Sequence, residues 1–180
     1  QAQFFCSNLF AFKIDYNTSA NPLYNGNIAK TTWQTANDHV NRHYTYSYDA
    51  LNRITEAISN DGNYNLSNVT SDKAGNILSL DRKGHLNDAA SSFGDMDKLM
   101  YNYSHNEISN KLLKVTDNGN DTFGFKDGNK TGDDFEYDVN GNLTIDRNKG
   151  IDQITYNHLN LPTTVTVSGT NNGTINYVYD

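Results

Sequence analysis

The chain has 180 residues, 28 of them asparagine, and a formal net charge of -7. Its mean hydropathy of -0.75 is low, yet only 19% of residues are charged, and 12 tyrosines and 8 phenylalanines supply side chains that favour strands over disorder. The acidic balance and the lack of any lysine or arginine cluster exclude nucleic acid as an expected partner, because phosphate binding needs a basic surface.

The first segment with apolar character is Phe4–Phe12, which is short and lacks the basic start of a signal peptide, so it predicts a strand. Cys6 is the single cysteine, which rules out an internal disulfide. No stretch approaches the ~18 apolar residues of a membrane helix, and we expect no membrane insertion. Trp33 lies between threonines in KTTWQT, where a strand would give it a core or cross-strand position.

Aromatic residues recur with a period of two along the chain, as in YTYSY at Tyr44–Tyr48 and in FEY at Phe135–Tyr137. This spacing places rings on one face of a strand, where neighbouring strands can stack them as cross-strand pairs. The predicted strand-face tyrosines are Tyr44, Tyr46, Tyr48, Tyr101, Tyr103, Tyr137, Tyr156, Tyr177 and Tyr179. Helix signals are almost absent, and only Asn87–Met100 offers a turn or two of helix.

A turn phrase repeats between these strands. In each copy an aspartate or asparagine precedes by three residues a glycine or asparagine, in the pairs Asp49 and Asn52, Asp72 and Gly75, Asp138 and Gly141, and Asn157 and Asn160. The first side chain can accept a backbone N–H two residues on, and the fourth residue tolerates a positive φ. The phrases therefore predict tight turns that join strands, and a repeated unit of this kind builds architecture.

A longer repeat relates two parts of the chain. MDKLMYN from Met96 aligns with IDQITYN from Ile151, and NKLLKVT from Asn110 aligns with NLPTTVT from Asn160. Between the aligned blocks the first copy has seven residues, 103–109, where the second has two. We predict two equivalent hairpins, the first with a loop five residues longer, and no linker that divides residues 1–180 into separate domains.

These phrases resemble a known family. YSYDALNRIT, YDVNGNLT and ITYNHLNLPT are similar to the repeats of RHS/YD-repeat proteins, and the order of phrases from Tyr24 to Asp180 resembles the RHS proteins of Bacteroidetes-type bacteria. The resemblance covers nearly the whole chain. Two features depart from the family pattern: Asn52 and Asn160 replace the usual glycine, and Ser71 stands where tyrosine usually precedes Asp72.

The resemblance implies an all-β fold in which repeated antiparallel β-hairpins form a strip of an RHS/YD-repeat β-shell. In relatives that are toxins the shell encloses a C-terminal toxic domain, and in teneurins a related barrel serves cell adhesion. It implies a non-catalytic structural segment of a secreted or cell-surface bacterial protein, with three kinds of partner: the remainder of a longer parent chain, an enclosed toxin domain, or secretion machinery. The alternative is an adhesin or carbohydrate-binding module whose exposed tyrosines stack on sugar rings. The downstream segment in which family aspartates release the toxin cannot be placed in residues 1–180.

Other chemistry has weaker support in the sequence. His39 and His43 have the spacing of helical zinc ligands, but the segment reads as a strand, so we interpret them as surface histidines. Asp134, Glu136 and Asp138 are interpreted as one solvated strand face. Aspartates 117, 121, 127, 133 and 134 are likewise interpreted as parts of soluble turns. Phosphate-binding, dinucleotide and nucleophile motifs are absent, and we expect no catalytic residue, cofactor or metal.

Overall fold

The structure is a computed structural model that describes residues 9–104 and 109–180. Within these residues the chain forms two antiparallel sheets built from hairpins, and the only helical elements are two single-turn 3-10 helices. Strands account for more than a third of the chain. The all-β prediction is thus confirmed, while the described residues form no closed shell.

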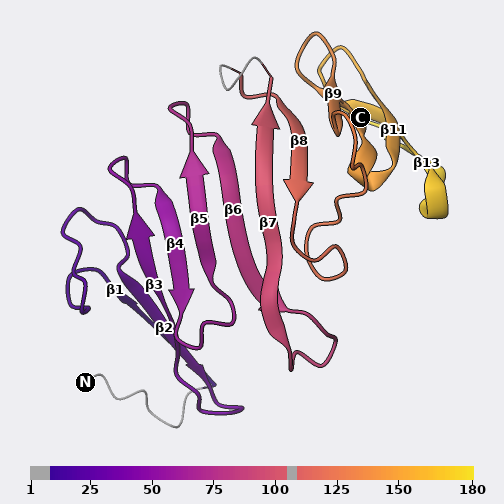
Figure 1. The fold of residues 1–180 in the computed structure, drawn as a ribbon. Helices are drawn as coiled ribbons and strands as arrows, with labels where there is room; N and C mark the ends of the chain where they lie inside the picture. Colours follow the sequence, from indigo (N-terminus) through magenta and orange to yellow (C-terminus); the bar gives the residue numbers. More distant parts are fainter. Residues whose placement is uncertain (1–8, 105–108) are drawn as a thin grey trace. The chain divides into compact units, whose positions relative to one another are not determined.

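The first sheet has eight strands, and their order in the sheet is their order in the chain (Figure 1). These strands are β1 (Phe10–Asp15), β2 (Lys30–Thr35), β3 (Arg42–Tyr48), β4 (Ile54–Ser59), β5 (Leu66–Ser71), β6 (Ile77–His85), β7 (Phe93–Tyr103) and β8 (Leu112–Asp117). Each successive connection is therefore a hairpin, as a repeated strand and turn unit requires.

The second sheet has five strands in the order β13-β12-β11-β10-β9. Its elements are β9 (Phe135–Tyr137), β10 (Leu143–Asp146), η1 (Arg147–Lys149), β11 (Ile151–Tyr156), β12 (Pro162–Val167), η2 (Gly169–Asn171) and β13 (Gly173–Asn176). A register shift lies next to Tyr48 in β3 and next to Tyr156 in β11, just before the turn that each tyrosine precedes. Such shifts increase local twist and re-aim side chains.

The chain divides into two compact units. One contains Gln1–Thr70 and Leu80–Asp97, and the other contains Ser71–Ser79 and Lys98–Asp180. Strands β6 and β7 pass from one unit to the other. Every contact described below lies within a single unit.

The strand alternation predicted around Tyr44 is present in β3. Tyr44 lies opposite Thr31 on β2, and its ring stacks on Trp33 with a centroid distance of 5.7 Å. Trp33 therefore has the predicted cross-strand role. The strand predicted for Phe4–Phe12 begins at Phe10, and residues 1–8, including Cys6, lie outside the described part of the chain.

The helical turn predicted within Asn87–Met100 is wrong. Asn87 instead closes a tight turn, in which its Oδ1 accepts the Ser91 N–H at 2.9 Å and Ala90 has a φ of 48°. From Phe93 the chain continues as the long strand β7. Alternating side chains such as Met96 are buried there against β6, so strand pairing overrides the local alanine preference for helix.

The two aligned blocks do form equivalent hairpins, β7 with β8 and β11 with β12. The first hairpin closes with a bond from Ser104 N to Lys111 O, and the second with a bond from Asn157 N to Leu161 O. Tyr103 belongs to β7, as expected of a strand-face tyrosine, so this strand runs two residues beyond Tyr101, the residue that aligns with Tyr156 at the end of β11. The rest of the predicted longer loop includes residues 105–108, which lie outside the described ones.

The apolar core is thin, as the composition predicts. Among the described residues the buried apolar side chains are Ala29, Met96, Leu99 and Val115. Buried polar side chains are more numerous, and seven of them are aspartates, namely Asp15, Asp72, Asp97, Asp117, Asp127, Asp134 and Asp146. Hydrogen bonding at the turns must therefore supply specificity that few apolar contacts provide.

Candidate functional site

The repeated turns share one local geometry. In each turn the first side chain accepts, through Oδ1, the backbone N–H four residues on. These bonds run from Arg53 to Asp49 at 3.0 Å, from Asn76 to Asp72 at 2.9 Å, from Asn142 to Asp138 at 2.8 Å and from Leu161 to Asn157 at 3.1 Å. The N–H two residues on also bonds to Asp49, Asp138 and Asn157 at 2.8 to 2.9 Å. One short side chain thus satisfies backbone donors that no strand pairs.

The fourth residue of each turn has the left-handed conformation that the spacing predicts. The φ values are 61° at Asn52, 95° at Gly75, 88° at Gly141 and 59° at Asn160. Asparagine tolerates this region better than other non-glycine residues, so two of the turns form with asparagine at this position. The asparagine and glycine turns therefore share one backbone geometry.

The aspartate turns have a further bond that the asparagine turn lacks. The residue after the positive-φ position donates its side chain to Oδ2, from Arg53 Nε at 2.6 Å, Asn76 Nδ2 at 2.8 Å and Asn142 Nδ2 at 2.9 Å. The Arg53 backbone bond lowers the pKa of Asp49, and the Asn142 side chain lowers the pKa of Asp138. Burial raises the pKa of Asp72, but the bonds from Asn76 outweigh it and the net pKa is lowered. The turns therefore favour ionised carboxylates.

Four tyrosines, three of which directly precede one of these turns, bond to the hairpin before their own. Each hydroxyl donates to a backbone carbonyl, from Tyr48 to Ile28 at 2.8 Å, from Tyr137 to Leu112 at 2.8 Å, from Tyr156 to Leu143 at 2.7 Å and from Tyr179 to Pro162 at 2.6 Å. Leu112, Leu143 and Pro162 are each the first residue of a strand that leaves the preceding turn, and Ile28 lies two residues before β2. We call these four bonds the tyrosine links; each joins one repeat to the next.

Ser71 occupies the position of the linking tyrosine before Asp72. A serine hydroxyl is much closer to its own backbone than a tyrosine hydroxyl is, so it cannot span to a neighbouring turn. The turn at Asp72 keeps its local bonds but lacks this link. The tyrosine and the aspartate of the phrase therefore have separate structural roles.

The remaining predicted tyrosines are arranged differently. Tyr46 bonds to Thr31 Oγ1 and the Tyr44 hydroxyl donates to the Tyr64 carbonyl, both at 2.9 Å. Tyr101 and Tyr103 lie in β7 opposite Val115 and Leu112, and Tyr177 follows β13 with 43% of its surface exposed. Tyr44 has ring contacts with both Trp33 and Tyr46, so in β3 ring contacts and hydroxyl bonds occur together.

Sequence reasoning missed a set of asparagines that connects neighbouring turns. Asn52 Oδ1 accepts the side-chain amides of Asn25 at 2.8 Å and Asn27 at 3.0 Å. In the other unit the same arrangement recurs, since Asn160 Oδ1 accepts Asn140 at 3.2 Å and Asn142 at 2.8 Å. The signal was available as the tripeptide NGN, which occurs at both donor sites. Asparagine suits these positions because its side chain offers both an acceptor and two donors.

Two acidic interpretations from the sequence are wrong. Asp134 is fully buried and does not belong to a solvated face. Its carboxylate accepts the Val115 N–H at 2.8 Å, Asn129 Nδ2 at 3.0 Å and Lys114 Nζ at 3.3 Å. Burial raises the pKa of Asp134, but these hydrogen bonds, led by that from Val115, outweigh it and the pKa is lowered. The carboxylate thus takes the place of a missing strand partner for β8.

Aspartates 117, 121, 127, 133 and 134 were also expected to be solvated, yet Asp117 and Asp127 are buried, as Asp134 is. Asp117 Oδ1 accepts the Lys98 N–H at 2.8 Å, and Asp127 Oδ2 accepts the Asp117 N–H at 3.1 Å. Asp121 and Asp133 are exposed, as expected of turns. Buried carboxylates in this unit therefore bond to backbone donors, which is a structural use of acidic side chains.

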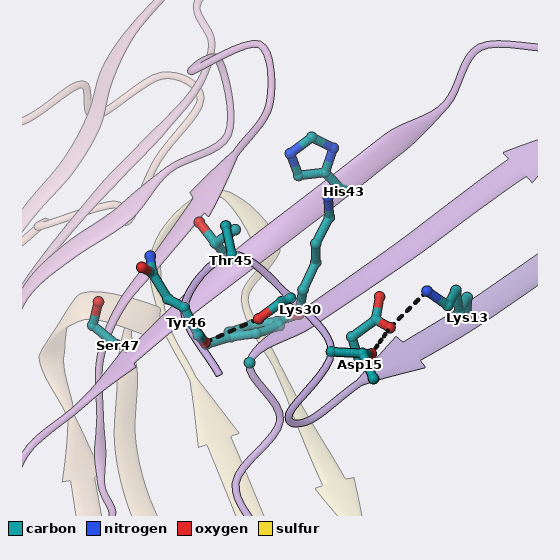
Figure 2. A pocket seen from close by; sticks show the side chains of 12 residues that line it. Lys13, Asp15, Lys30, His43, Thr45, Tyr46 and Ser47 are labelled. Atoms are coloured by element: carbon teal, nitrogen blue, oxygen red, sulfur yellow. Dashed lines mark hydrogen bonds and ion pairs between the residues drawn. The ribbon is translucent and has the colours of Figure 1, made fainter. Parts of the chain in front are cut away.

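A polar pocket of about 460 Å³ lies on the face of β1, β2 and β3 within the first unit (Figure 2). Lys13 and Asp15 line it from β1, Lys30 from β2, and His43 and Thr45 from β3. Strand register places Asp15 opposite Lys30 and Lys30 opposite Thr45. Figure 2 shows the Lys30 side chain extending toward His43. His43, interpreted from the sequence as a surface residue, is half-buried here, and burial followed by the charge of Lys30 lowers its pKa.

Residues 9–104 and 109–180 contain no group of three or more histidine, cysteine, aspartate or glutamate side chains suited to a metal ion. Over the same residues, no helix has the length and apolar character needed to span a bilayer. Comparison with family models and with curated proteins finds no match to this chain.

Proposed function

We propose that residues 1–180 are a non-catalytic structural segment of an RHS-repeat shell, which encapsulates or presents a C-terminal toxin of a secreted bacterial protein. The tyrosine links carry this proposal. Each link joins a tyrosine to the hairpin before its own, as between Tyr156 and Leu143. A repeat that is bonded to its predecessor in this way propagates along the chain and builds a wall.

The links also favour a shell over an adhesin. An adhesin that stacks tyrosines on sugar rings needs those rings free in a groove. Tyr48, Tyr137 and Tyr156 are instead half-buried, and their hydroxyls are bonded to protein. Burial raises the pKa of all three, in keeping with rings that pack against neighbouring hairpins.

The outer strands of the two sheets support a larger assembly. Among the described residues, β1 pairs only with β2, and β13 pairs only with β12. The side chains on these strands include exposed apolar ones, such as Phe12 on β1 and Ile175 on β13. An unpaired, apolar strand edge is a template for pairing with further protein.

The test is the mass and stability of the purified chain. We expect isolated residues 1–180 either to self-associate, as measured by light scattering, or to have a low Tm in thermal unfolding. Phe12→Lys and Ile175→Lys should each lower the measured mass, because a charge on an edge strand opposes pairing. Val139→Lys is the matched control, since Val139 is 99% exposed in the turn between β9 and β10 and lies on neither β1 nor β13.

A dilute, monodisperse monomer with one sharp, high-temperature transition would overturn the shell proposal in favour of a self-contained β domain. A reduction in mass by Val139→Lys equal to that of the edge variants would show that added charge alone disperses the chain. The toxin assignment has its own test. A longer parent chain should continue downstream into an apolar core segment and a variable C-terminal domain. A parent chain without these two parts would contradict the toxin assignment.

A further inference from the structure

The pocket on β1, β2 and β3 contains positive charge that the protein does not neutralise. Lys13 is already paired, because its ammonium lies 2.6 Å from Asp15 Oδ1, and that oxygen also accepts Thr18 Oγ1 at 2.7 Å. Among the described residues, neither the Lys30 ammonium nor the His43 ring makes a hydrogen bond or an ion pair, and the charge of Lys30 acts on Asp15, opposite it in the sheet, only at longer range. The lining thus holds two lysines and one carboxylate, in a chain with a net charge of -7.

Strand register explains why these groups meet. Lys13, Thr32 and His43 lie opposite one another across β1, β2 and β3, and Asp15, Lys30 and Thr45 form the next row on the same face. The connection that follows β1 adds Ser19 and Asn21 to the lining. The site therefore lies mainly on three paired strands, which position side chains more precisely than loops do.

The composition of the lining selects among ligands. One lysine without a carboxylate partner suits a single negative charge, and the nearby hydroxyl and amide groups of Thr45, Ser47 and Asn21 suit ring hydroxyls. The volume of about 460 Å³ is in the range of small-ligand sites and accommodates one or two sugar rings. The Tyr46 hydroxyl is engaged by Thr31, so recognition here relies on charge and hydrogen bonds more than on ring stacking.

We propose that this pocket binds an acidic sugar through one carboxylate, with the Lys30 ammonium as its ionic partner and His43, Thr45 and Ser47 beside the sugar hydroxyls. The proposal is independent of the shell function, because it uses only side chains on the face of β1, β2 and β3 and the connection after β1. A shell wall or an adhesin could each present such a site.

The experiment is calorimetric titration of the chain with D-glucuronate and D-galacturonate, with D-glucose, acetate and inorganic phosphate as comparison ligands. At least one uronate should bind. Glucose and acetate should each bind at least tenfold more weakly, since glucose lacks the carboxylate and acetate lacks the sugar hydroxyls. Lys30→Gln should weaken uronate binding about tenfold or more, as expected for a lost charged hydrogen bond. Lys83→Gln is the matched control, because Lys83 is an exposed lysine on β6 in the same unit.

A second variant separates the sugar from the charge. Thr45→Val should weaken uronate binding while leaving acetate binding unchanged, and its circular dichroism should match the unsubstituted chain. Three results would overturn the proposal. The first is that neither uronate gives a heat of binding in the titration or shifts the His43 imidazole resonances in an NMR spectrum. The second is that Lys30→Gln and Lys83→Gln lose the same uronate affinity, and the third is that phosphate binds as tightly as the uronates. The last result would identify a general anion site without sugar recognition.

Discussion

Tyr156→Phe isolates one tyrosine link. The substitution removes the hydroxyl that donates to the Leu143 carbonyl at 2.7 Å and keeps the ring. Both Tyr156 and Leu143 are half-buried, so water replaces the lost donor only in part. A typical net hydrogen bond contributes about 0.5 to 1.5 kcal/mol, and a carbonyl left unpaired adds to the cost, so we expect a loss of about 1 kcal/mol.

For a chain of 180 residues, this loss corresponds to a fall in Tm of about 2 to 4 °C. Thermal and urea unfolding measure it, with the urea slope checked for constancy so that the change reflects stability alone. Tyr177→Phe is the matched control. The Tyr177 side chain is largely exposed, and its hydroxyl makes no hydrogen bond to the described residues, so its removal should shift Tm by less than the error.

Tyr137→Phe, which removes the bond to Leu112 at 2.8 Å, should have a similar effect to Tyr156→Phe. In the double variant the two losses should not simply add, because Leu143, the acceptor of the Tyr156 hydroxyl, lies directly opposite Tyr137 in the sheet. The reasoning is refuted if Tyr156→Phe and Tyr137→Phe unfold like the unsubstituted chain, or if Tyr177→Phe costs as much as either. In that case ring packing alone would connect the repeats.

Two further predictions concern the turns. Gly141→Val should destabilise the chain by about 1 kcal/mol or more, because Gly141 has a φ of 88° and a β-branched side chain resists that conformation. Gly173→Val is the control, since Gly173 lies on an exposed strand without a positive φ, and it should cost less in the same urea unfolding experiment. Acid should weaken the turns that begin with aspartate, because folding lowers the pKa values of Asp49, Asp72 and Asp138. The stability that these carboxylates contribute is fully present above the unfolded pKa of about 4, and it is lost as the pH falls through the folded pKa values. Asp138→Asn, which copies the uncharged turn at Asn157, should reduce the fall in Tm between pH 7 and pH 3, and an unchanged fall would contradict this origin.

The turns could be predicted from the sequence because their bonds are local. Asp138 contacts the backbone of residues two and four positions away, and the positive φ of Gly141 follows from the same five residues. No distant contact is needed to form this turn, so the residues of one phrase are enough to predict it. The alternation of Tyr44, Tyr46 and Tyr48 likewise fixed a strand and one face of it.

Tertiary structure alone decided which groups these side chains meet. The partner of Tyr156 is a carbonyl in the previous hairpin, and the ring spacing could not distinguish a hydroxyl bond from ring stacking. Asp134 appeared solvated in an alternating pattern, yet it is buried because it pairs with the Val115 N–H of a distant strand. Lys30 and His43 carry no motif, and only the pairing of β2 with β3 brings them into one pocket. Local hydrogen bonds are encoded within a few residues, whereas burial and charge neutralisation depend on strand register, which is a property of the whole sheet.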